Sequence, residues 1–230
     1  MTAMLMLAAA LNACGEAKWV EPTAETRPWA ICHLMGNAVE KAELAKEMRR
    51  WSEAGLGGVR LVPIYAAKGN GDRNIATMSP EFVSLLKDAK ALAAANGMKV
   101  DLSFGAGWCF GGRTTPEKLG CQNIKTLKPG EPAPKGAKLL FEQEGTRLVS
   151  YFSGQRVKRA QTIDSGPMMN PFSTAAMAAH LSLFGNLDRD PSAYPRAAFH
   201  DSFEYECNWS DELPALFLNH RVYRIEDHYA

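Results

Sequence analysis

The sequence has 230 residues, and its 26 Lys and Arg against 25 Asp and Glu give a formal net charge of +1. This balance gives no indication of a nucleic-acid partner or of an anionic surface as the target. Hydrophobic content of 46% and charged content of 22% are ordinary for a globular protein with a sizeable core. The five cysteines have no paired metal-ligand spacing and are too sparse for a disulfide scaffold; they are Cys14, Cys32, Cys109, Cys121 and Cys207.

The N-terminal residues are predicted to be an export signal and a tether. Residues 3–11 form an apolar run that is too short to span a membrane and is typical of a signal peptide. The following Asn12-Ala13-Cys14-Gly15 resembles a bacterial lipobox, in which the cysteine is lipidated. We therefore expect residues 1–26 to be a signal and tether, and the protein to be periplasmic or anchored to the outer membrane through Cys14. A short buried or frayed helix is the alternative.

From residue 27 the pattern alternates between strands and helices. Apolar runs predict strands at Pro28–Leu34, Gly57–Tyr65 and Met98–Phe104. Helices are predicted between them, one over Ala38–Trp51 with an apolar stripe and one from Pro80 with Ser79 as its N-cap. This order is a βαβαβ unit, for which parallel strands and right-handed crossovers are expected.

Residues 113–170 interrupt this alternation and are predicted to be a small β insertion, with strands at Lys138–Phe141 and Arg147–Ser153. Ser173 is predicted to cap a further helix. The stretch 197–205 is predicted to be the fourth parallel strand, and a short helix follows near Asp211–Asn219. Because the first strand is not followed by a Gly-rich dinucleotide fingerprint, we expect about the first half of a TIM-type parallel (β/α) barrel rather than a dinucleotide-binding fold.

Residues 197–209 combine an apolar start with carboxylates, a histidine and aromatic residues, as catalytic strand ends in α/β enzymes do. In an extended strand His200, Ser202, Glu204 and Glu206 would share one face. An ordinary strand end with solvated acids is the alternative explanation of the same pattern.

Several motifs, taken together and in order, resemble family 106 glycoside hydrolases, the α-L-rhamnosidases. They are Arg27-Pro28-Trp29, Met35-Gly36-Asn37, the run Gly55–Tyr65, the turn Gly105–Gly112 (GAGWCFGG), Val157–Ala160, Asn170–Ser173, and Asp201-Ser202-Phe203-Glu204 with Trp209. The resemblance covers residues 27–230. It implies an inverting glycosidase that removes terminal rhamnose from oligo- or polysaccharides, with Glu204 as general acid. It also implies a Ca²⁺ ion that helps to bind sugar hydroxyls.

The sequence departs from this family in two respects. Family members usually carry a glutamate in the loop where this chain has Asn70-Gly71-Asp72. They also continue for several hundred residues, so we expect 27–230 to be a partial catalytic domain that lacks the second carboxylate. Little or no turnover is expected from this chain alone.

Five residues are candidates for substrate binding. Trp108 on its glycine-rich turn could be a platform for a sugar ring or a plug of the barrel mouth. His33 and Tyr65 close the first two strands, where polar groups could reach hydroxyls, although a structural role is the more common one for a single histidine. Asp201 could bind sugar or brace the strand, and Trp209 could contact substrate or pack its loop.

Other polar residues are predicted to be structural. Lys158 and Arg159 are expected to be a solvated basic pair, Asp101 a buried hydrogen-bonded carboxylate, and the cysteines packing thiols. Two alternatives to the glycosidase remain open: a non-catalytic carbohydrate-binding lipoprotein, and an inactive gene fragment.

Overall fold

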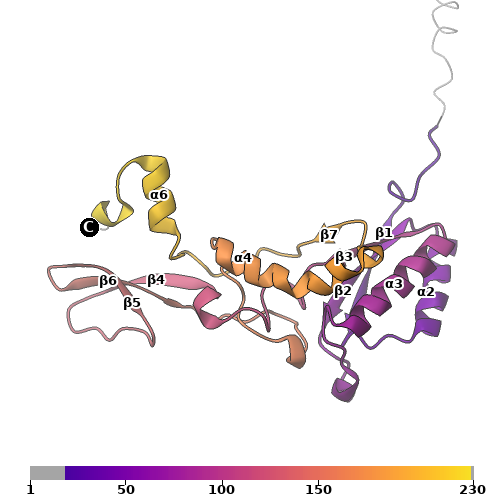
Figure 1. The fold of residues 1–230 in the computed structure, drawn as a ribbon, viewed down its shortest axis with the longest axis horizontal. Helices are drawn as coiled ribbons and strands as arrows, with labels where there is room; N and C mark the ends of the chain where they lie inside the picture. The colour runs from indigo at the N-terminus through magenta and orange to yellow at the C-terminus, as the bar shows by residue number, and fades with distance from the viewer. Residues whose placement is uncertain (1–18, 229–230) are drawn as a thin grey trace, which may run out of the picture.

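The computed structural model describes residues 19–228, which form an elongated molecule (Figure 1). A parallel α/β unit lies at one end, an antiparallel β-sheet at the other, and helix α4 between them. Within the described residues no helix combines the length and apolar character needed to cross a bilayer. The predicted signal and its Cys14 lie outside the described residues.

The parallel sheet confirms the α/β class predicted from the sequence. Its strands are β1 (Trp29–Met35), β2 (Gly58–Ile64), β3 (Lys99–Ser103) and β7 (Ala198–Phe199), hydrogen-bonded in the order β1-β2-β3-β7. All three pairings are parallel. Asp101, in the middle of β3, accepts two hydrogen bonds from the Arg196 guanidinium, at 3.0 and 2.7 Å, which confirms its predicted structural role. Barrel closure is not tested by these four strands and remains a prediction.

Helices α2 (Lys41–Glu53) and α3 (Pro80–Ala95) cover one face of this sheet. Ser79 caps α3 as predicted, since its hydroxyl accepts a hydrogen bond from the Phe82 N–H at 3.2 Å. Apolar side chains from both helices and from β1, β2 and β3 form one core; its fully enclosed members include Met48, Leu61, Phe82, Leu86 and Leu102. Because one face of each helix is buried, apolar residues recur in the sequence at helical spacing, and this is why both helices could be predicted.

The opposite face of the sheet is open at β1. Ile31 and Met35, which alternate with the buried Leu34, are 58% and 41% exposed. His33 lies between them on the same face and is also exposed. Since β1 continues to Met35, His33 sits inside the strand instead of closing it, which corrects its predicted position. The sheet therefore presents apolar side chains on two faces, and only one of them is covered by helices.

The insertion after β3 is a three-stranded antiparallel sheet, with strands β4 (Gln122–Leu127), β5 (Lys138–Gln143) and β6 (Thr146–Phe152) in the order β4-β6-β5. The sequence predicted β5 and β6. It missed β4, whose Gln-Asn-Ile-Lys-Thr-Leu composition gives only a weak alternation signal. Strand β4 is stabilised by its pairing with β6, a contact that its own sequence pattern does not indicate.

Residues 19–228 contain three further helices: α4 (Thr174–Leu181), α5 (Gly185–Arg189) and α6 (Leu213–Arg221). Short 3₁₀ turns occupy Gly71–Arg73, Glu117–Leu119, Thr162–Asp164, Ser182–Phe184, Pro191–Ala193 and Ile225–His228. Ser173 caps α4 as predicted, accepting from the Ala176 N–H at 3.2 Å. The Glu212 carboxylate also accepts from the Thr174 N–H at 3.0 Å, so the segment before α6 is tied to the start of α4.

Residues 200–205 do not continue β7, contrary to the prediction of a strand over 197–205. The strand ends at Phe199, and the chain then curls so that the Tyr205 hydroxyl lies 3.0 Å from Nε2 of His200. The same hydroxyl accepts a hydrogen bond from the Phe110 N–H at 2.8 Å. These contacts tie the segment to the turn after β3, and the predicted alternation of side chains over two faces is therefore wrong.

His180 of α4 is fully buried and holds the same turn from the other side. Its Nε2 donates to the Phe104 carbonyl at 2.9 Å, and its Nδ1 accepts from the Gly111 N–H at 3.2 Å. Its ring also stacks on Phe110. One nitrogen must donate and the other accept, so the imidazole is neutral. Burial is the main reason that the pKa of His180 is lowered, and the nearby His200 adds to this effect.

Stability is expected to fall between pH 7 and pH 5 because of His180. A lowered folded-state pKa means that the contribution is fully present above the unfolded pKa of about 6.5 and is lost as the pH drops through the folded value. His180→Gln keeps one donor and one acceptor without titrating, so urea unfolding should show a flatter pH dependence for this variant. An equal slope for His180→Gln and the unsubstituted protein would contradict the assignment.

Candidate functional site

The candidate site lies at the carboxyl ends of β2, β3 and β7. Tyr65 directly follows β2, Trp108 is on the turn after β3, and Glu204 is in the segment after β7. Because parallel strands end at the same edge of a sheet, these three side chains come from one rim of the molecule. This is the rim on which α/β enzymes carry their reacting groups.

The segment Val157–Ala160 crosses this rim and joins two of the strand ends. The Lys158 carbonyl accepts a hydrogen bond from the Trp108 N–H at 3.1 Å, and the Arg159 carbonyl accepts one from the Tyr65 N–H at 2.8 Å. Arg159 has a left-handed backbone with φ of 64°, which is uncommon for a residue other than glycine. The crossing segment therefore holds Tyr65 and Trp108 through their backbones, in a defined and partly strained conformation.

Gly107 explains why the turn after β3 is rich in glycine. A Cβ at Gly107 would overlap the Lys158 carbonyl oxygen and lie 2.9 Å from the Ala160 nitrogen. A Cβ at Gly111, where φ is 130°, would likewise overlap the Pro167 carbonyl oxygen. The glycines are thus required by the close approach of two backbones, not by a phosphate or by flexibility.

Arg159 places its guanidinium against both aromatic rings of the site. Its central carbon is 5.0 Å from the ring centroid of Trp108 and 5.7 Å from that of Tyr65. Both distances are within the range of cation–π attraction. The aromatic surfaces predicted to bind sugar are therefore already in contact with a flexible cation, which a ligand would have to share or displace.

Glu204 is held by two donors. Its Oε2 lies 2.6 Å from Nζ of Lys158, and its Oε1 accepts a hydrogen bond from the Ser202 hydroxyl at 2.8 Å. The hydrogen bond from Lys158 has the largest effect in lowering the pKa of Glu204, and the one from Ser202 adds to it. The hydrogen bond with Glu204 raises the pKa of Lys158. Glu204 is therefore ionised near neutral pH. A general acid needs the opposite shift, so proton donation by Glu204 requires Lys158 to move away.

Removal of the Lys158 ammonium should release Glu204. In Lys158→Ala we expect the pKa of Glu204 to rise toward its ordinary value of about 4.3, with the Ser202 hydrogen bond still acting in the opposite direction. A ¹³C NMR titration of the glutamate carboxyl carbons measures this change. Lys138→Ala, which breaks an exposed pair with Asp211, is the matched control. A Glu204 pKa that is the same in all three proteins would contradict the ion pair.

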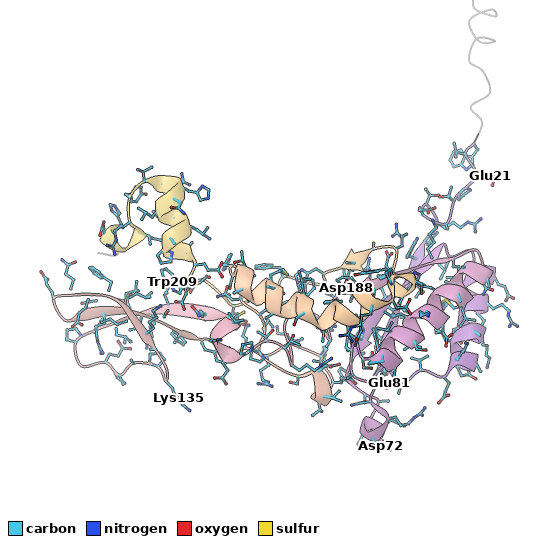
Figure 2. The ribbon with its side chains drawn as sticks, in the orientation of Figure 1. Glu21, Asp72, Glu81, Lys135, Asp188 and Trp209 are labelled. Carbon is cyan, nitrogen blue, oxygen red and sulfur yellow. The ribbon has the colours of Figure 1, made fainter. Side chains whose placement is uncertain are left out.

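The remaining predicted residues do not all reach this rim. Asp201 is exposed, and within residues 19–228 its carboxylate has no hydrogen bond or ion pair, so the predicted bracing role finds no partner there. Trp209 is 2% exposed and lies beside β4, in a bridge with Gln122 (Figure 2). It packs the interior, which corrects its assignment as a substrate contact. Asp72 is exposed in an outer 3₁₀ turn (Figure 2).

Lys158 and Arg159 are the site residues that sequence reasoning missed. They were predicted to be a solvated basic pair, but their side chains contact Glu204, Trp108 and Tyr65. The available signal was the resemblance of Val157–Ala160 to a family motif. Two adjacent basic residues in a loop give no other indication of function.

The described residues do not fit a Ca²⁺ site. Ca²⁺ takes six to eight oxygen ligands, mainly from carboxylates. Within residues 19–228 no group of three or more His, Cys, Asp or Glu side chains is arranged to hold a metal ion. Glu204, the carboxylate of the candidate site, is already engaged by an ammonium group.

A hollow of about 570 Å³ lies on the antiparallel sheet, lined by Lys118, Tyr151, Phe152, Asp211 and neighbouring residues. None of the candidate site residues lines it. The chemistry of the open rim, with a carboxylate, two cations and two aromatic rings, therefore marks the candidate site more clearly than the shape of the surface does.

Comparisons with known proteins give distant matches only. No family model matches the sequence, and no curated protein matches it significantly. Among solved structures, a rhamnosidase from Novosphingobium sp. PP1Y is similar at 19% identity and a TM-score of 0.37, over 48% of this chain and 11% of that one. A sucrose 6F-phosphate phosphorylase from Thermoanaerobacter thermosaccharolyticum is similar at 15% identity and a TM-score of 0.35, over 76% of this chain and 39% of that one.

By their names both neighbours are carbohydrate-active enzymes. The chain spans about a tenth of the length of the first and about two fifths of the length of the second.

Proposed function

We propose that this chain is a sugar-binding part of a glycoside hydrolase of the α-L-rhamnosidase type, with Glu204 as its acid carboxylate. The observation that carries the proposal is the convergence of four separate family-like motifs on one rim. These four parts of the chain are far apart in the sequence, yet two backbone hydrogen bonds and one ion pair join them: Tyr65, Trp108, the crossing segment at Lys158 and Arg159, and Glu204.

The open face of the sheet supports a barrel as the complete architecture. In a TIM barrel one face of every strand packs against helices and the other faces an apolar interior. The exposed Ile31 and Met35 have the character of interior side chains. We propose that the four βα units are part of such a barrel, and that additional strands would cover these residues.

The proposed chemistry divides between two carboxyl groups. In an inverting glycosidase one carboxylic acid protonates the leaving oxygen while a second carboxylate, about 6.5–9.5 Å away, activates a water molecule. Once Lys158 has moved away from Oε2, Glu204 would take up a proton from solvent and deliver it from Oε2 to the glycosidic oxygen. Within residues 19–228 no second carboxylate is hydrogen-bonded into the same cluster.

Carbohydrate binding without cleavage is the second candidate, and one observation favours it. The Lys158–Glu204 ion pair keeps the acid ionised in the free chain. In that state Glu204, Lys158 and Arg159 can still hydrogen-bond sugar hydroxyls while Trp108 lies against a sugar ring, but Glu204 has no proton to donate.

Calorimetry with methyl α-L-rhamnoside tests the proposal. We expect the chain to bind it more tightly than methyl α-D-glucoside, with binding lost in Trp108→Ala. Phe172→Ala removes an exposed aromatic outside the site and should leave binding unchanged. Absence of any rhamnoside binding, or equal binding by Trp108→Ala and the unsubstituted chain, would contradict the proposed site.

An aryl α-L-rhamnoside tests whether the chain cleaves as well as binds. We expect no release of the aryl group above the buffer rate by the purified chain. If release is observed, Glu204→Gln should abolish it, and full retention of activity in this variant would refute the acid assignment.

We also propose export with a lipid at Cys14, as the N-terminal sequence indicates. Labelling of cells with radioactive palmitate should mark the protein, and Cys14→Ser should remove the label. Unlabelled protein in the cytoplasmic fraction would contradict this.

A further inference from the structure

Two cysteines outside the proposed sugar site lie against each other. Cys121 directly precedes β4 and is fully buried, while Cys207 follows Glu204 by three residues and is half-buried. Both pack in the second apolar cluster of the protein, with Met168, Met169 and Tyr205. They are 86 positions apart in the sequence, so only the fold brings them together.

Contacts of the backbone hold the segments that carry the two thiols together. Gln122, the residue after Cys121, donates its N–H to Sγ of Cys207 at 3.4 Å. Its carbonyl accepts from the Asn208 N–H at 3.0 Å, and it forms an antiparallel bridge with Trp209. The Cys121 thiol donates to the Met169 carbonyl at 3.3 Å, and the Cys207 thiol donates to Oδ1 of the next residue, Asn170, at 3.4 Å. Because their partners are consecutive residues, the two thiols lie side by side.

The other two described cysteines differ in this respect. Cys109 donates to the Ser202 carbonyl at 3.6 Å, and Cys32 packs against the core of the parallel unit. Within residues 19–228 neither of these two thiols is hydrogen-bonded to a residue next to another cysteine, as Cys207 is to Gln122. Packing alone would therefore account for Cys32 and Cys109, whereas Cys121 and Cys207 form a pair.

We propose that Cys121 and Cys207 are a redox-active dithiol that closes to a disulfide when the protein meets a small-molecule disulfide oxidant. The product would join the start of β4 covalently to the segment that carries Glu204. This inference is independent of the proposed sugar site.

The difference in pKa between the two thiols sets the order of the steps. The adjacent Cys121 thiol, together with the N–H of Gln122, lowers the pKa of Cys207 to about 7 against the effect of burial. The proximity of Cys207 and burial raise the pKa of Cys121. Cys207 is thus the thiol that ionises more readily, and it is also the more exposed of the two.

The reaction is a thiol–disulfide exchange in two steps. The Cys207 thiolate attacks one sulfur of the oxidant, the oxidant S–S bond breaks, and one thiolate leaves. Cys121 then loses its proton, attacks Sγ of Cys207 and displaces the second thiolate. The two cysteines lose two protons and two electrons, and the oxidant is reduced to two thiols.

The test is equilibration of the purified, folded chain in buffers of reduced and oxidised glutathione. Remaining thiols are blocked with N-ethylmaleimide, and the protein is analysed by intact mass and peptide mapping. We expect two thiols to disappear together and one crosslinked peptide, Cys121–Cys207. Cys32→Ser should behave in the same way, whereas Cys121→Ser and Cys207→Ser should each give no crosslink.

Alkylation kinetics keep the test decisive if a serine variant folds poorly. In the unsubstituted protein Cys207 should react with iodoacetamide first, with a rate midpoint near pH 7. Crosslinking that involves Cys109, stable glutathione on Cys207 with Cys121 still free, or no thiol loss in oxidised glutathione would each overturn the proposal.

Discussion

Replacing Asp164 by Ala is expected to lower the free energy of unfolding by about 1–3 kcal/mol for each buried donor that loses its acceptor. The Asp164 side chain is 1% exposed, and its carboxylate accepts hydrogen bonds from four donor groups. They are the Thr77 N–H at 2.9 Å, the Thr77 hydroxyl at 2.6 Å, the Gln161 amide at 2.6 Å and the Arg113 guanidinium at 3.0 Å. Removal of the carboxylate leaves the buried Thr77 N–H and hydroxyl without this acceptor, whereas Gln161 and the exposed Arg113 keep their hydrogen bonds to the Ile75 and Thr77 carbonyls.

The position of Asp164 makes this loss structural as well as electrostatic. It joins three segments: the loop after β2 at Thr77, the turn after β3 at Arg113, and the segment that continues from Lys158 and Arg159. We therefore expect Asp164→Ala to loosen the rim and weaken rhamnoside binding along with stability.

Urea unfolding measures the effect. Asp211→Ala, which breaks an ion pair with Lys138 between two largely exposed side chains, is the control and should cost no more than about 1 kcal/mol. A loss for Asp164→Ala no greater than that of the control would show that the buried network does not hold the three segments together.

Replacing Gly107 by Ala is expected to cost about 1–3 kcal/mol, the usual range for forcing an extra carbon into a packed region. The added Cβ would meet the Lys158 carbonyl and the Ala160 nitrogen, which are backbone atoms and cannot rotate away. The segment that holds Trp108 and Tyr65 would have to move outward.

The change should therefore affect the site more than the core. In Gly107→Ala we expect the hydrogen bonds to the Lys158 and Arg159 carbonyls to weaken, and rhamnoside affinity to fall at least as much as stability. Gly71→Ala is the matched control, because nothing lies within 4 Å of its added Cβ. Amide hydrogen exchange at Tyr65 and Trp108 reports the displacement, and unchanged protection at both would contradict it.

The parallel unit was predictable because its patterns are local. Ser79 and Ser173 cap helices as expected, and the strands up to β3 match their apolar runs within a few residues. These features depend on side-chain propensity and on periodicity, which are properties of one segment.

The errors share a physical cause, since each involves a contact between distant segments. The stretch after Phe199 looked like a strand, but the Tyr205 hydroxyl binds His200 and Phe110 instead. Trp209 was predicted either to contact substrate or to pack its loop, and it is buried beside β4. The pairing of Lys158 with Glu204 likewise depends on a loop conformation that no local pattern encodes.

The long insertion between β3 and β7 has a consequence for the order of folding. β1, β2 and β3 pair with strands that are near in the sequence, whereas β7 pairs with β3 only after some 95 intervening positions, as the partners Leu102 and Ala198 show. Closing a loop of that length costs entropy before any contact is gained, so we expect β7 to dock late. With two residues it is also the shortest strand and the one most readily released. The strand that precedes Glu204 would then be the last to dock on the sheet during folding and the first to detach from it.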